Sequence, residues 1–183
     1  YLPKMVKGEI ITAMAMTEPS TGSDLQNIKT RANIKDNKII LNGSKTFITN
    51  GQNADLVLVV AKTDNTKKAK GISIILCEEN RKGFQKGKNL KKIGMKAQDT
   101  SELYFQDVEL PLKNILGYSG QGFAQLMDEL PQERLSIAVT AIAAAESALN
   151  WTISYSKERK AFDTKLINFQ NTKFTLAKLK TEL

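Results

Sequence analysis

The sequence predicts a β + α chain, in which an antiparallel β-barrel or sandwich is followed by helices. Three observations support this class. Up to about residue 115, short β-rich runs alternate with turn residues at the spacing of all-β domains. After residue 120 the hydrophobic pattern becomes helical. No strand–helix–strand rhythm is present, which argues against a Rossmann domain.

The β prediction begins with the stretch KIILNGSKTFITNG at 38–51. We expect two strands joined at Asn42-Gly43, because Asn-Gly is the strongest short hairpin signal. Further strands are expected at 55–62, 71–79 and 101–110.

The helical prediction covers the rest of the chain. GYSGQG at 117–122 is interpreted as a turn leading into a helix, because its glycine order differs from that of a dinucleotide-binding loop. Residues 136–149 are apolar on nearly every face, which predicts a helix buried in a bundle. An amphipathic helix is predicted near the end of the chain, because apolar residues recur there at multiples of three or four: Leu166, Phe169, Leu176, Leu179 and Leu183. Two helices cannot cover each other completely, so we expect further sequence or another subunit to cover 136–149.

Composition excludes several classes of function. The chain has 183 residues, 41% hydrophobic and 25% charged, which fits a soluble globular protein. No apolar run approaches the ~18 residues of a membrane span, so no membrane role is expected. Histidine is absent, which removes Ser/His/Asp chemistry and the commonest zinc ligand, and no metal is expected. The lone Cys77 is expected to be a buried thiol of an intracellular protein. The chain begins at Tyr1 and ends within a helical pattern, so we expect a piece of a longer protein.

The loop MTEPSTGSDLQ at 16–26 is the first candidate site. Thr17 follows an apolar strand, which would place its hydroxyl rigidly. Gly22 lets a ligand approach the backbone, and Ser23 could then reach a phosphate oxygen. The alternative is an ordinary polar turn.

Phe47 and Thr49 form the second candidate, because residues two apart in a strand point to the same face. An aromatic ring beside a hydroxyl could stack on a heteroaromatic ring and hydrogen-bond its edge. The alternative is a core phenylalanine beside a hairpin threonine.

The segment ELPQERL at 129–135 is the third candidate. Pro131 suits the first turn of a helix or a kink in a longer one. Glu133 and Arg134 precede the apolar stretch, where desolvation could raise the pKa of a carboxylate into the working range of a base. The alternative is an acid near a helix N-terminus that faces water.

The net charge of +8 is concentrated between Lys62 and Lys96. Such a segment favours anionic partners such as nucleic acid, a phosphate-bearing cofactor or thioester, or an acidic protein. The alternative is that these lysines are simply solvated.

Four motifs in this order resemble the acyl-CoA dehydrogenase family: AMTEPSTGSDLQNIKT, LNGSKTFITNG, GMKAQDTSELYFQDVELP and ERKAF. ELPQERL is most similar to the long-chain and isovaleryl branch. The resemblance implies that 1–7 end a preceding helical domain or linker, 8–115 form a β-barrel middle domain, and 116–183 begin a C-terminal helical bundle. It also implies FAD as cofactor, an acyl-CoA substrate, an electron-transfer flavoprotein as acceptor, a homotetramer, and a bacterial cytoplasm or mitochondrial matrix location.

The resemblance also implies roles for single residues. Met16, Thr17, Gly22 and Ser23 would hold the isoalloxazine edge and the pyrophosphate, and Ser23 would also contact substrate. Phe47 would lie against the flavin ring, and Thr49 would hydrogen-bond near its reactive nitrogen. The residues expected to contact the adenosine diphosphate end of a neighbouring subunit's FAD are Arg159, Phe162 and Gln170.

By the same resemblance, Glu133 is the base that removes the α-proton of the acyl-CoA, and Arg134 orients the base or the substrate. Two residues depart from the family pattern: Ser20 and Asp163 stand where glycine is usual. The alternatives are an acyl-CoA oxidase, which shares the architecture but passes electrons to oxygen, and a DNA-associated relative. The DNA-associated alternative is considered because of the basic segment between Lys62 and Lys96, although binding of nucleic acid is not the expected function.

Overall fold

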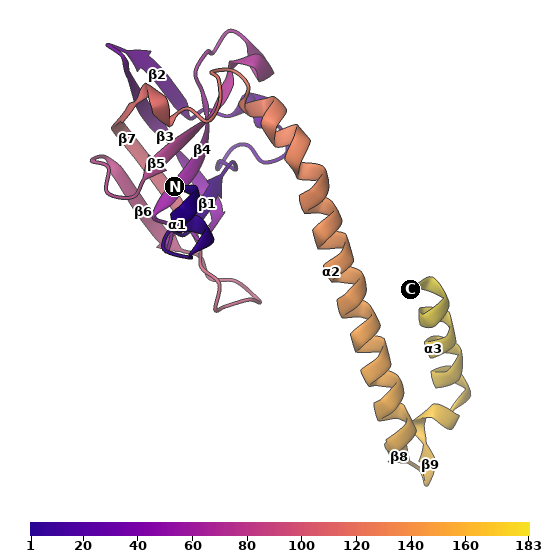
Figure 1. The fold of residues 1–183 in the computed structure, drawn as a ribbon. Coiled ribbons are helices and arrows are strands. Elements are labelled where there is room, and N and C mark those ends of the chain that lie inside the picture. Colours follow the sequence, from indigo (N-terminus) through magenta and orange to yellow (C-terminus); the bar gives the residue numbers. More distant parts are fainter. The chain divides into compact units, whose positions relative to one another are not determined.

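The chain divides into a β unit, Tyr1–Met127, and a helical unit, Asp128–Leu183. A computed structural model describes all of residues 1–183. The β unit contains the short helix α1 (Leu2–Val6), a sheet and the start of α2 (Gly122–Glu158). The helical unit holds the rest of α2, a small hairpin and α3 (Gln170–Glu182) (Figure 1). None of the helices combines the length and apolarity needed to cross a bilayer.

The β unit is built on a seven-stranded sheet. The strand bounds are β1 Thr12–Ala15, β2 Arg31–Lys35, β3 Lys38–Thr49, β4 Leu56–Lys62, β5 Ile72–Glu78, β6 Phe84–Asn89 and β7 Thr100–Pro111. The hydrogen-bonded order is β1-β4-β2-β3-β7-β6, and β5 also pairs with β4. β7 alternates between buried and more exposed residues over most of its length, as in a strand with one covered face. β4 and β5, which are rich in valine and isoleucine, are instead buried at nearly every residue.

The sheet is mixed, where the sequence predicted antiparallel pairing throughout. β1 runs parallel to β4, with Thr12 opposite Leu56 and Ala15 opposite Val59. The remaining extended ladders are antiparallel. The β + α class is therefore confirmed. Residue periodicity identifies a strand but does not give the direction of its partner, and this is why the parallel pair was not predicted.

The predicted hairpin at Asn42-Gly43 is wrong. β3 runs unbroken through both residues, and the register against β7 shifts there as at a β-bulge. A Cβ at Gly43 would lie 2.7 Å from the Cα of Thr30, so this glycine permits close approach of backbone rather than a turn. The hairpin lies earlier, at Asp36 and Asn37, which have φ of 50° and 59° and join β2 to β3 as in a type I′ turn.

The core of the β unit is apolar. Phe84 on β6 stacks on Phe105 on β7 with ring centroids 5.1 Å apart. Cys77 is fully buried in this core, as predicted, and burial raises the pKa of its thiol to about 12. The other large core side chains include Ile39, Leu41, Val57, Val59, Ile75, Leu103, Val108 and Leu110.

The turn 117–122 leads into α2, as predicted. The Gly120 N–H donates to Ser73 Oγ at 2.9 Å, and a Cβ at Gly122 would collide with the backbone of Ser73. Pro131 lies inside α2 and not in its first turn, because the helix begins nine residues earlier, at Gly122. Its missing N–H leaves the carbonyl of Met127 without the usual helical partner.

In the helical unit, α2 ends at Glu158 and is followed by the hairpin of β8 (Lys160–Ala161) and β9 (Thr164–Lys165). α3 then turns back alongside α2 (Figure 1), where Lys180 Nζ lies 3.9 Å from Glu146 Oε1. Residues 136–149 are helical, as predicted. Within this chain most of their apolar side chains are exposed, including Ile137, Val139 and Ile142, whereas Leu149 is buried.

Candidate functional site

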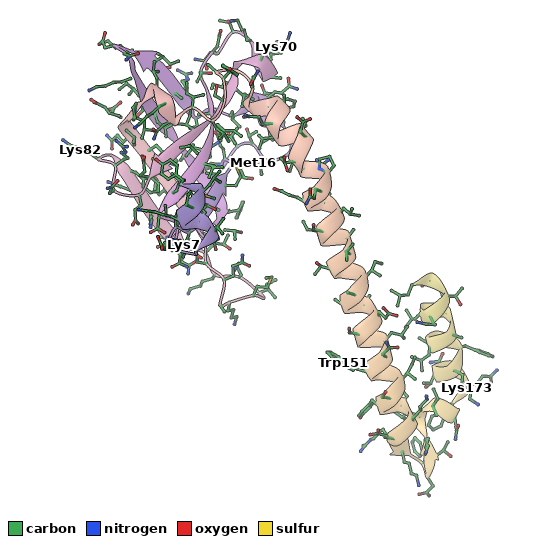
Figure 2. The ribbon with its side chains drawn as sticks, in the orientation of Figure 1. Lys7, Met16, Lys70, Lys82, Trp151 and Lys173 are labelled. Atoms are coloured by element: carbon green, nitrogen blue, oxygen red, sulfur yellow. The ribbon has the colours of Figure 1, made fainter.

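Four of the predicted cofactor residues line one cavity in the β unit. Met16 and Thr17 follow β1, and Phe47 and Thr49 belong to the end of β3 (Figure 2 labels Met16). The cavity has a volume of about 440 Å³. Its other lining residues are Thr12, Ala13, Met14, Ile48 and Asn50. The structure thus brings together two segments that lie thirty residues apart in the chain.

A β-bulge in β3 sets the direction of the Phe47 ring. The register against β7 shifts between Lys45 and Ile48, and Phe47 takes a left-handed φ of 58°. Thr46 and Ile48 are buried, whereas Phe47 is 67% exposed and Thr49 is exposed beside it. The core-phenylalanine alternative is therefore wrong. A left-handed conformation is costly for a residue with a large side chain, and such outliers concentrate at functional sites.

Hydrogen bonds hold the two walls of this cavity in place. The Thr46 N–H donates to the Thr17 carbonyl at 2.9 Å. Asn50 Nδ2 donates to the Thr12 carbonyl at 3.2 Å, and Lys45 Nζ donates to the Met16 carbonyl at 2.8 Å. Three hydrogen bonds thus fix β1 and the two residues that follow it to the end of β3 and to Asn50.

Gly22 and Ser23 are not among the lining residues. Both are exposed, and they follow a turn that two backbone hydrogen bonds close between Glu18 and Thr21, of 2.8 and 3.1 Å. A Cβ at Gly22 would meet no atom of the chain within 4 Å, so protein packing does not require glycine there. Ser20, in the middle of this turn, has no left-handed φ, so the serine costs no backbone strain in place of glycine.

Sequence reasoning missed Glu18 and Lys45, which form a buried ion pair beside the lining residues. Lys45 Nζ lies 3.0 Å from Glu18 Oε1. Burial lowers the pKa of Lys45 to about 8, although Glu18 acts in the opposite direction. Burial would raise the pKa of Glu18, but hydrogen bonds from Thr30 and the charge of Lys45 lower it below its usual range. One signal was available: Lys45 has the inward parity of Ile39 and Leu41, and a charge at an inward position needs a partner.

The remaining predicted residues belong to the helical unit. Glu133 and Arg134 are consecutive, exposed residues of α2. Phe162 lies at the tip of the β8–β9 hairpin with 94% of its surface exposed. Arg159 directly precedes that hairpin, and Gln170 begins α3 after it. These three residues therefore surround one short hairpin.

Asp163 fits its position in that hairpin. Phe162 and Asp163 have φ of 52° and 56°, the left-handed pair of a type I′ turn. Aspartate tolerates this conformation better than most residues, which explains why it can stand where glycine is usual.

Comparisons with known proteins agree over the whole chain. Residues 13–108 match the family model "Acyl-CoA dehydrogenase, middle domain", and residues 120–183 match "Acyl-CoA dehydrogenase, C-terminal domain". The long-chain specific acyl-CoA dehydrogenase of Mus musculus is 51% identical over all of this chain and 43% of its own length. The isovaleryl-CoA dehydrogenase of Pongo abelii is 41% identical over all of this chain and 44% of its own length.

The fold agrees as well. The crystal structure of acyl-CoA dehydrogenase from Geobacillus kaustophilus matches all of this chain with a TM-score of 0.95 and 49% identity, over 48% of that chain. The chain thus spans less than half the length of these relatives. Two family models, extensive identity and a shared fold show that this chain belongs to the acyl-CoA dehydrogenase family.

Proposed function

We propose that the protein carrying this chain is an FAD-dependent acyl-CoA dehydrogenase that converts an acyl-CoA thioester to the trans-2-enoyl-CoA. The observation that carries the proposal is the cavity where Met16, Thr17, Phe47 and Thr49 converge in a chain of this family. Members of the family use FAD. When bound, FAD accepts the hydride that leaves the β-carbon of the substrate.

The cavity suits one edge of a flavin. Phe47 offers an exposed ring for contact with a flat heteroaromatic system, while the hydroxyls of Thr17 and Thr49 can bond its polar edge. Met14 and Met16 add polarisable apolar surface. The open space beside Gly22 leaves room for the pyrophosphate, and Ser23 can donate to a phosphate oxygen or to the substrate.

The second part of the proposal concerns proton removal. Glu133 takes the α-proton of the acyl-CoA, and Arg134 orients the carboxylate or the substrate. Hydrogen bonds to the thioester carbonyl stabilise the negative charge that develops as this proton leaves. The assignment of Glu133 rests on the similarity of ELPQERL to the long-chain and isovaleryl branch.

The third part concerns assembly. Arg159, Phe162 and Gln170, around the β8–β9 hairpin, contact the adenosine diphosphate end of FAD in a neighbouring subunit of a homotetramer. Phe162 and the apolar side chains of α2 are exposed in this chain. Exposed apolar surface of this kind supports the packing of another subunit against the helical unit. We propose an electron-transfer flavoprotein as acceptor and a bacterial cytoplasm or mitochondrial matrix as the compartment.

The test is a titration of the protein, in its full natural length, with acyl-CoAs of graded chain length. Bleaching of the flavin absorbance by one class of thioester supports the proposal and identifies the preferred length of the acyl chain. A protein that purifies without flavin and binds none on addition of FAD contradicts it. Reduction of an electron-transfer flavoprotein supports a dehydrogenase, whereas hydrogen peroxide production supports an oxidase.

A second candidate function, DNA binding, is favoured by one observation. Lys91, Lys92 and Lys96 line a cavity of about 330 Å³ on the loop between β6 and β7. A protein using these lysines would show DNA affinity that falls steeply with salt concentration. Flavin bleaching by acyl-CoA together with salt-independent, weak DNA retention contradicts this candidate.

A further inference from the structure

The Glu18–Lys45 pair differs from the other ion pairs of the chain in its burial. Its side chains are 0% exposed for Lys45 and 3% for Glu18. The carboxylate also accepts hydrogen bonds from the backbone N–H groups of Lys29, at 2.6 Å, and Thr30, at 2.9 Å. Every carboxylate oxygen therefore has a donor. A buried pair of this kind contributes little net stability, because desolvation offsets the attraction of the two charges. Net stabilisation of the fold therefore does not explain why this pair is present.

The pair lies where the two walls of the flavin cavity meet. Lys45 is two residues before Phe47 on β3, and its second hydrogen bond reaches the carbonyl of Met16 on the other wall. Glu18 follows Thr17 directly and opens the turn that leads to Gly22 and Ser23. One lysine therefore joins both walls, while one carboxylate fixes the path of the loop that follows.

We propose that Glu18 and Lys45 are positioning residues, which hold the 16–23 loop against β3 so that the groups from both segments face the same flavin. This inference rests on the proposed function. Neither side chain is among the residues that line the cavity. Their effect passes through the Met16 carbonyl, the Thr17–Thr46 backbone hydrogen bond and the turn at Glu18–Thr21.

A merely structural role makes a different prediction. If the pair only stabilises the fold, FAD affinity must follow stability in every variant. If it positions the loop, the two quantities separate when both charges are removed together. Lys45→Met alone leaves a buried, unpaired carboxylate and should strongly destabilise the protein. Glu18→Gln/Lys45→Met removes both charges and should recover most of that stability, but the Met16 carbonyl still lacks its donor.

The experiment compares Glu18→Gln, Lys45→Met and the double variant, each in the protein at its full natural length. The matched control is Lys38→Met/Glu109→Gln, which removes an ion pair of 2.8 Å that also starts from β3 but is exposed on both sides. We measure the dissociation constant of FAD, the urea midpoint and the visible circular dichroism of the bound flavin.

The expected result is that the double variant unfolds near the wild-type midpoint yet binds FAD about 10- to 100-fold more weakly, the value of a lost hydrogen bond from a charged group. The flavin dichroism of Glu18→Gln should also change, while the control stays within about twofold of wild type. FAD affinity that recovers together with stability in the double variant overturns the proposal.

A readout without flavin separates this inference from the proposed function. The Thr46 amide donates to the Thr17 carbonyl of the loop, so its hydrogen exchange reports whether the loop is held against β3. In the apoprotein this exchange should accelerate about tenfold in the double variant and remain unchanged in the control. Unchanged exchange overturns the positioning role. Wild-type protein that binds no FAD contradicts the proposed function, while the exchange result still decides whether the pair holds the loop.

Discussion

Phe47 and Thr49 both project from the exposed side of β3 into one cavity, with the buried side chain of Ile48 between them. Alternation along a strand would produce this arrangement, but here a bulge and a left-handed Phe47 contribute to it. Most of the Phe47 surface is free within this chain, so its ring does little for the core. The strained backbone that presents it therefore points to a ligand.

Phe47→Gly is expected to raise the free energy of unfolding by about 0.5–1 kcal/mol, because glycine takes the left-handed conformation without strain. The same variant should bind FAD more weakly, since the ring contact is lost. Urea unfolding and FAD titration check the two effects. Phe47→Ala serves as the control, which loses the ring but keeps the backbone strain. Destabilisation of Phe47→Gly by more than about 1 kcal/mol would show that the ring packs in the fold.

Gly43→Ala is expected to destabilise the β unit by about 2 kcal/mol or more, because the new methyl group would collide with the Thr30 backbone and side chain. Gly94→Ala is the matched control, since a Cβ there meets nothing within 4 Å, and it should stay within about 0.5 kcal/mol of wild type. Thermal or urea unfolding measures both. A neutral Gly43→Ala would mean that Gly43 is not packed against β2 and its neighbours as described.

Gly43 also shows why part of the fold could not be predicted. Asn-Gly is a strong local turn signal, but the contact with Thr30 is a tertiary requirement that no local pattern records. Lys45 is a similar case, because a single lysine in a strand resembles a solvated residue until its buried partner Glu18 is known. The strands β4, β5 and β7 and the two long helices were predictable from periodicity, which is local, whereas β2 and β6 were not predicted. Strand direction and bulges depend on contacts between segments that are distant in the chain.

Only some of the candidate site residues could be proposed from the sequence pattern itself. Thr17, Phe47 and Thr49 could be proposed from residue type and spacing, and the structure brings them together with Met16. Gly22 and Ser23 lie next along the chain but outside that lining. For Glu133, Arg134, Arg159, Phe162 and Gln170 the family resemblance supplies the roles, so these assignments stay predictions.

The β unit should lose stability in acid through Glu78. Partial burial alone would raise the pKa of this carboxyl, but hydrogen bonds from Arg81 and Tyr1 lower it to about 2. Its folded pKa thus lies below the unfolded one, near 4.5. The stabilisation is fully present above pH 4.5 and is lost as the pH falls toward 2.

In Glu78→Gln the free energy of unfolding should therefore fall less steeply between pH 4.5 and 2 than in the wild type. At pH 7 the variant should lose less stability than a variant of a buried ion pair would, because the Glu78 carboxyl is partly exposed. Urea unfolding at a series of pH values measures this slope. An unchanged slope in the variant would mean that Arg81 and Tyr1 do not hold the carboxylate in solution.

Glu133→Gln is expected to abolish turnover while the yellow FAD complex is preserved. Glutamine has nearly the same shape but cannot accept the α-proton, so the rate of flavin bleaching by acyl-CoA should fall by at least about 10²- to 10⁴-fold. The FAD affinity should not change, because Glu133 is not among the groups proposed to bind it. Stopped-flow absorbance with a saturating thioester measures the bleaching rate.

Glu129→Gln is the matched control, since Glu129 is an exposed acid one turn earlier on the same helix α2. It should bleach at the wild-type rate. Bleaching that is equally fast in Glu133→Gln would assign the base to a carboxylate outside this chain. Arg134→Met tests the role of Arg134 separately. If the variant raises KM and leaves kcat unchanged, the guanidinium orients the substrate. If kcat and kcat/KM fall equally, the guanidinium acts only in the transition state, by orienting the Glu133 carboxylate.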